Sequence, residues 1–135
     1  LLHGTTGRSL RLEAIRASLG GADRPYDGGI SYRSHLQNIG WESASASDGA
    51  LSGTTGESRR LEAVQVSLTG DMGEHLSVWY RVHSQNLGWL GWAHDGRPAG
   101  TTGMALRGEA VEVQILSQGA TPEGHDASRK AVVVG

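Results

Sequence analysis

Apolar and polar residues alternate along three long segments of this chain. Apolar residues, many of them β-branched, occupy every second position, and polar residues such as Arg16, Gln65 and Glu112 stand between them. This period of two predicts strands that bury one face and expose the other. The three apolar series are Ile15, Ala17 and Leu19; Val64, Val66 and Leu68; and Val111, Val113 and Ile115.

Two further segments alternate in the same way. No segment carries a sustained apolar stripe at the 3.6-residue spacing of an amphipathic helix, so the pattern predicts a nearly all-β protein. The apolar faces carry Ile30, Tyr32 and Leu36 in one segment, and Leu76, Val78, Tyr80 and Val82 in the other. The opposite faces carry Arg33, His35 and Gln37, and then Arg81, His83 and Gln85 with Trp79 beside them.

The same two phrases recur at an interval of roughly 48 residues, which indicates a repeat protein. Gly-Thr-Thr-Gly occupies residues 4–7, 53–56 and 100–103, and Tyr-Arg-x-His-x-Gln-Asn-x-Gly-Trp occupies 32–41 and 80–89. Asn-x-Gly predicts a turn, after which Trp opens a short returning strand, and Asp-Gly marks a second turn. We therefore expect a single domain over residues 1–135. Its parts are a half repeat (1–27), two repeats (28–74 and 75–119) and a tail (120–135) that includes a possible closing strand.

Units of this length suit closed β architectures. We expect a repeat-built, pseudo-three-fold, β-prism-like fold, with a β-trefoil as the alternative. A closed ring needs a third Tyr-to-Trp half, which residues 120–135, a second chain or sequence outside this fragment would have to supply. A homo-oligomer formed through the incomplete repeat is one consequence, because an unfilled unit leaves a sheet edge to be paired.

These phrases resemble the clostridial hydrophobic repeat family, or ChW repeats. Its units read Tyr-x-x-His-x-Gln-x-x-Gly-Trp, then Asp-Gly, Gly-Thr-x-Gly and Arg-x-Glu-Ala before an alternating strand. The resemblance covers about residues 1–119, with Gly108 in place of an apolar residue as one departure. It implies a secreted or surface-attached bacterial module, often appended to wall hydrolases or adhesins and suspected to bind carbohydrate or wall polymer.

The composition narrows the classes of partner. A net charge of −2 gives no electrostatic reason to expect nucleic acid. No apolar run approaches the roughly 20 residues that cross a bilayer, so we expect no membrane insertion. Cysteine is absent, which excludes disulfides. The chain starts without Met or a signal segment, and we expect a mature or excised fragment.

The four tryptophans are candidates for stacking on sugar rings. Trp41 and Trp89 follow equivalent turns, and each either stacks on a ligand or plugs the core of its repeat. Trp79 and Trp92 have no counterpart in the other repeat, where Ser31 and Ala44 take their places. Core positions should repeat, so Trp79 and Trp92 are predicted to be exposed contact residues.

Histidine and glutamine two residues apart project from the same strand face. His35 with Gln37, and His83 with Gln85, could hydrogen-bond vicinal hydroxyls or lock onto a neighbouring loop. Asp48 and Asp95, in the Asp-Gly turns, complete the candidate ligand set. Four further histidines do not fall at positions equivalent to these pairs: His3, His75, His94 and His125. Their side chains are therefore not predicted to converge, and we expect neither a metal nor a cofactor.

Glu13, Glu62 and Glu109 have the parity of the buried residues Ile15, Val64 and Val111. We interpret each as a structural acid that accepts hydrogen bonds from the Gly-Thr-Thr-Gly loop while Arg11, Arg60 or Arg107 supplies the countercharge. One acid per unit does not make a catalytic pair, and no nucleophile motif is present.

We therefore expect no enzymatic activity but a multivalent glycan- or wall-polymer-binding module. The alternative is a structural or protein-binding module. A glycosidase is a third hypothesis.

Overall fold

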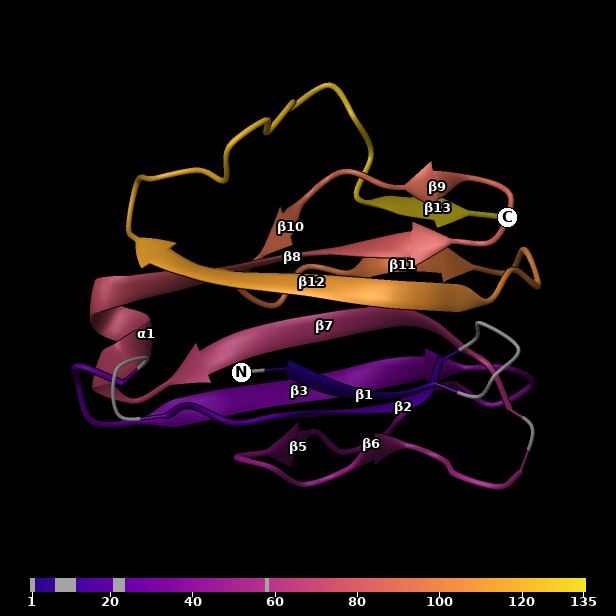
Figure 1. Cartoon of the computed structure of the whole chain (residues 1–135), viewed down its shortest axis with the longest axis horizontal. Helices are drawn as coiled ribbons and strands as arrows, with labels where there is room; N and C mark the ends of the chain where they lie inside the picture. Colours follow the sequence, from indigo (N-terminus) through magenta and orange to yellow (C-terminus); the bar gives the residue numbers. More distant parts are fainter. Residues whose placement is uncertain (1, 7–11, 21–23, 58) are drawn as a thin grey trace.

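The computed structural model describes residues 2–6, 12–20, 24–57 and 59–135. Gly7 and Arg11, which the sequence predictions include, lie outside these ranges. The described residues form strands and one short helix, so the protein is nearly all β as predicted (Figure 1). The strands are β1 (Leu2–Thr6), β2 (Leu12–Ala17), β3 (Gly29–Leu36), β4 (Gly40–Trp41), β5 (Ala46–Ser47), β6 (Ser52–Gly53), β7 (Leu61–Thr69), β8 (Leu76–Ser84), β9 (Gly88–Trp89), β10 (Ala93–His94), β11 (Ala99–Thr102), β12 (Gly108–Ser117) and β13 (Val132–Val134); the helix is α1 (Asp71–His75).

Both repeats fold in the same way. In each, the Tyr-His strand pairs antiparallel with the Arg-x-Glu-Ala strand, β3 with β7 and β8 with β12. Tyr32 lies opposite Val66 in the first pair, as Tyr80 lies opposite Val113 in the second. The Asn-x-Gly turns have the predicted positive φ, and the returning strands β4 and β9 follow them.

The Gly-Thr-Thr segment of each repeat pairs with the long strand of the preceding repeat. β6 pairs with β2, and β11 pairs with β7. Gly53 lies opposite Ala14, and Gly100 lies opposite the equivalent Ala63. The repeats are therefore joined by hydrogen-bonded sheet edges as well as by their apolar faces.

The first Gly-Thr-Thr-Gly departs from this rule. Gly4 to Thr6 lie in β1, which pairs with β2 in the position that β3 takes against β7. Only residues 7–11 separate β1 from β2, a connection short enough to favour a direct antiparallel hairpin. The first copy of the phrase, which the repeat pattern predicts to lie as the other two do, therefore has different surroundings.

The core lies between the sheets and is filled by the predicted apolar faces. Ile30, Tyr32 and Val64 are fully buried, and so are the equivalent Val78 and Tyr80. The series on β12 behaves differently. Its members only pack against the core and remain half-buried: Val111, Val113 and Ile115.

The buried Tyr80 hydroxyl donates a hydrogen bond to the backbone carbonyl of Arg97. Burial, which disfavours the charged phenolate, raises the pKa of Tyr80 to about 12. Between pH 10 and 12 the unfolded chain loses this proton while the folded chain retains it. The free energy of unfolding should therefore fall by about 2–3 kcal/mol across this range. Urea denaturation at pH 9 to 12 would measure the fall, and Tyr80→Phe should remove it. An equally steep loss in that variant would assign the effect to other groups.

The tail adds a strand to the second repeat. β13 pairs in parallel with β11, and the Gly91 amide donates to the Lys130 carbonyl at 2.9 Å. The tail thus lies against the segment that follows Trp89. Among the described residues, no helix is long and apolar enough to cross a membrane.

Candidate functional site

A β-bulge positions the repeated glutamate. In the pairing of β3 with β7, His35 lies opposite Ala63 and Leu36 lies opposite Leu61, which leaves Glu62 as the extra residue. The register shifts in the same way around Glu109 in β12 and Glu13 in β2. A bulge re-aims a side chain and reverses strand parity. Leu61 and Val64 therefore both face the core, and Glu62 does not.

The bulge brings a carboxylate between a histidine and an arginine. Glu62 Oε1 lies 3.1 Å from His35 Nδ1, and its Oε2 lies 3.4 Å from Arg60 Nε. Glu109 repeats both distances with His83 and Arg107. The predicted arginine countercharge is thus confirmed in both repeats, while the histidine partner was not predicted.

The loop amides are a further predicted partner of the glutamate. The Gly56 amide, at the end of the second Gly-Thr-Thr-Gly, donates to Glu13 Oε2 at 3.3 Å. This bond confirms the prediction for the first glutamate.

Each histidine also contacts the tryptophan of its repeat. The His35 and Trp41 rings meet edge to face with centroids 5.3 Å apart, and His83 meets Trp89 at 5.2 Å. A guanidinium completes each cluster, because Arg33 lies 5.3 Å from the Trp41 ring centroid and Arg81 lies 4.4 Å from that of Trp89. Both indoles are half-buried and lie outside the hydrophobic core, so neither plugs it.

The unrepeated tryptophans do not behave alike. Trp92 is half-buried and lies 4.8 Å from the Arg81 guanidinium, which therefore contacts two indoles. Trp79 is only 8% exposed, so the prediction that it is an exposed contact residue is wrong. His94 stacks on the Trp79 ring at 4.4 Å, and His125 of the tail meets it edge to face. The tail thus covers the Trp79 ring. The equivalent residue of the first repeat is the smaller Ser31, which needs no such cover.

Glutamine and aspartate serve the backbone in both repeats. Gln37 Oε1 accepts from the Arg60 amide at 3.4 Å, and Gln85 does the same for Arg107. This is the loop lock that the sequence left open as an alternative, and it leaves the side-chain NH₂ for other partners. Asp48 and Asp95 each accept from a strand amide at 3.0 Å, at Ile30 and Val78.

The aspartates lie apart from the clusters. Ile30, which Asp48 contacts, and His35 are five residues apart on β3, a separation of roughly 16 Å along a strand. The structure thus brings histidine, glutamine and tryptophan together and places the aspartates near the other end of the strand.

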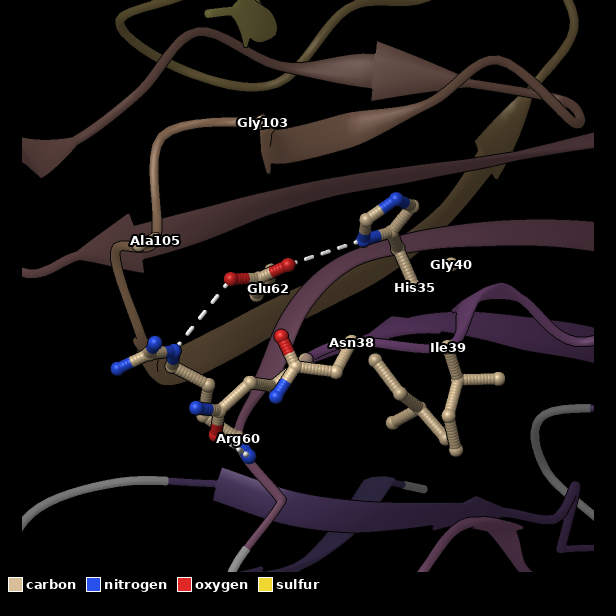
Figure 2. A pocket seen from close by; sticks show the side chains of 10 residues that line it. His35, Asn38, Ile39, Gly40, Arg60, Glu62, Gly103 and Ala105 are labelled. Carbon is tan, nitrogen blue, oxygen red and sulfur yellow. Dashed lines mark hydrogen bonds and ion pairs between the residues drawn. The ribbon is translucent and has the colours of Figure 1, made fainter.

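A pocket of about 370 Å³ opens beside the first cluster (Figure 2). Glu62 lies between His35 and Arg60 at this pocket, hydrogen-bonded to the histidine and ion-paired with the arginine (Figure 2). Gly103 and Ala105 close it from the next repeat. The rim includes the exposed Ile39, whose counterpart Leu87 is exposed as well.

The pocket combines hydrogen-bonding groups with apolar surface. His35 Nε2, the Gln37 amide and the Asn38 amide offer donors and acceptors, and Ile39 offers contact area. In the part of the chain that the structure describes, no group of three His, Asp or Glu side chains could hold a metal. Sequence reasoning missed Asn38 and Ile39 as lining residues, although both repeat as Asn86 and Leu87.

These features define a repeat-built, nearly all-β module with one indole–imidazole–carboxylate cluster in each repeat. The family model described as Clostridial hydrophobic W (ChW) matches residues 35–70 and 83–117, more than half of the chain. The protein therefore belongs to the ChW repeat family. Searches of curated proteins and of solved structures gave no match.

Proposed function

We propose that this chain is a non-catalytic module that binds glycan, such as a bacterial cell-wall polymer, through equivalent sites in its repeats. The observation that carries the proposal is the duplicate cluster, in which a half-buried indole meets an imidazole edge at 5.3 Å and 5.2 Å. Surface placement outside the core favours a contact role for Trp41 and Trp89. The proposal includes secretion or attachment at a bacterial surface, as the family resemblance implies.

The chemistry of each cluster suits a sugar ring. An indole offers a flat apolar surface and one N–H donor to the apolar face of a pyranose. His35 Nδ1 is engaged by Glu62, which leaves Nε2 for a hydroxyl. Gln37, in the turn that follows β3, lines the pocket beside His35 and offers its NH₂ to a second hydroxyl. In the second repeat, Arg81 donates to Glu112 at 2.6 Å and lies over the rings of Trp89 and Trp92.

Weak sites can act together. A single exposed site of this kind should bind at roughly millimolar concentration, or about −4 kcal/mol. Two sites on one polymer could increase the apparent affinity by about 10²- to 10⁴-fold without any new contact. Binding should therefore be strong for long polymers and weak for short oligosaccharides.

Replacing either indole tests the proposal. Trp41→Ala or Trp89→Ala should reduce retention on insoluble cell-wall polysaccharide by about 10- to 100-fold, because the remaining site binds without avidity. The double variant should lose retention. Sedimentation of the protein with increasing polymer would measure this.

Tyr26→Ala is the matched control, because Tyr26 is an exposed aromatic residue that stacks on His75, away from either cluster. Its retention should equal that of the parent. Retention that survives in the double Trp variant would contradict the proposal, provided that its circular dichroism matches the parent spectrum.

The contacts of the carboxylates support the proposed non-catalytic role. Glu62 and Glu109 are each shared by an arginine and a histidine. Glu42, the other acid near the first cluster, is held by the amides of Ser34 and Gly53 at 3.1 Å and by the Ser52 hydroxyl. A glycosidase would instead release reducing ends from the bound polymer, and Glu62→Gln or Glu109→Gln would stop that release.

A further inference from the structure

In the described part of the chain, the strand β12 is hydrogen-bonded to a neighbouring strand along one edge only, although β1 lies near it without pairing. Its pairing with β8 runs from Gly108 to Ser117. The equivalent strands β2 and β7 are each paired on both edges, the second edge by the Gly-Thr-Thr segment of the following repeat. No strand among the described residues pairs with the second edge of β12. Figure 1 shows β12 (orange) alongside β8.

The two occupied edges identify the backbone groups involved. The Val66 carbonyl accepts from the Gly96 amide at 2.7 Å, and the Ala17 carbonyl accepts from the Gly49 amide at 2.8 Å. On β12, Val113 takes the position that Val66 has on β7 and that Ala17 has on β2. Because backbone groups alternate between the edges of a strand, Val111 and Val113 direct their N–H and C=O groups to the open edge.

The side chains on β12 lack cover that their equivalents have. Ala63 and Val64 are fully buried, whereas Ala110 and Val111 are half-buried. The Glu109 side chain is 21% exposed and that of Glu62 is 6% exposed. In the first repeat, Gly103 and Ala105 of the following repeat border the Glu62 pocket. One additional strand and its loop would bury both the edge and the glutamate.

We propose that this edge binds the Gly-Thr-Thr strand of a ChW repeat outside this chain, by addition of one strand to the β8–β12 sheet. The glycine explains which strand fits. A Cβ on Gly53 or Gly100 would lie 2.4 Å or 2.3 Å from the carbonyl oxygen of Glu13 or Glu62, and both glycines have positive φ. The occupant therefore has glycine opposite Ala110.

A second copy of this chain has no such strand to spare. Its β6 and β11 are already hydrogen-bonded to β2 and β7, and its β1 is bonded to β2. The occupant is therefore a separate repeat whose own Gly-Thr-Thr strand is unpaired. This inference does not depend on glycan binding, because the edge of β12 contains neither Trp41 nor Trp89.

A peptide with the sequence of residues 97–106 is the probe. Added at millimolar concentration to the whole ¹⁵N-labelled chain, it should shift the Val111 and Val113 amide resonances and slow their hydrogen exchange at least about tenfold, as a paired edge does. The equivalent Val64 amide already lies in the pairing of β7 with β11 and should not change. The same peptide with Gly100→Val is the matched control and should have no effect.

Three results would overturn the proposal. The first is that the amide resonances and hydrogen-exchange rates of Val111 and Val113 stay unchanged at the highest soluble peptide concentration. The second is an equal effect of the Gly100→Val peptide. The third is a concentration-dependent dimer in sedimentation that the peptide does not dissociate, which would assign the edge to self-association. Polymer retention by the unmodified chain would be unaffected by any of these, so failure here is distinct from failure of the glycan proposal.

Discussion

Glu62→Ala should lower the free energy of unfolding by about 3 kcal/mol, because it leaves a half-buried arginine and histidine without their buried carboxylate. Glu62 is nearly fully buried and contacts both His35 and Arg60. Glu109→Ala removes the same contacts from a more exposed cluster, because the Glu109 side chain is 21% exposed and that of Glu62 is 6% exposed. Solvent can replace them there, so the loss should be about 1 kcal/mol. Urea denaturation of both variants at pH 7 would measure the difference.

Comparing these two variants separates the effect of burial on stability from the effect of the contacts that are removed. Both remove the same atoms at the same bulge, and the two carboxylates lie at the same distances from their partners. A difference in stability therefore reports the cover that the 103–105 loop gives to the first cluster. Equal losses would contradict this explanation and would mean that the cluster acts independently of the neighbouring repeat.

The alternation of the sequence was sufficient to predict most of the fold. It placed Tyr32 and Tyr80 in the core and located the turns at Asn38 and Asn86, because side-chain period and positive φ are local properties. It also predicted that Glu62 is buried with Arg60 as its countercharge, which the structure confirms, but it did not predict the bulge that turns this side chain toward His35. A bulge depends on the register between two strands, which one strand does not encode.

The tryptophans show a second limit. Repetition correctly distinguished Trp41 and Trp89 as a pair, and the structure shows that both are half-buried at equivalent positions. Trp79 was misplaced because its cover comes from His125, in a tail with no repeat pattern. Contacts between distant segments of unlike sequence leave no periodic signal, so such burial requires the structure.

The packing around the repeated Gly-Thr-Thr segment explains why its first residue is glycine. Gly100 has φ of +119°, and a Cβ there would lie 2.3 Å from the Glu62 carbonyl oxygen and 2.7 Å from the Ala63 Cα. Both contacts are with backbone atoms, so no side-chain movement can relieve the clash. Gly100→Ala should therefore lower the free energy of unfolding by about 4 kcal/mol, as the sum of backbone strain and overpacking.

Gly49→Ala is the control, because Gly49 also has positive φ (+95°) but a Cβ at this position would have no neighbouring atom within 4 Å. In Gly49→Ala, backbone strain alone should lower the free energy of unfolding by about 1–2 kcal/mol. The excess loss in Gly100→Ala then measures the close approach of β11 to β7, the contact that joins one repeat to the next. In Gly100→Ala, hydrogen exchange should also quicken at the Val64 amide, which lies in the pairing of β7 with β11. Equal stabilities for the two variants, with that amide still protected, would mean that the joint between repeats tolerates a side chain and that glycine is there only for its positive φ.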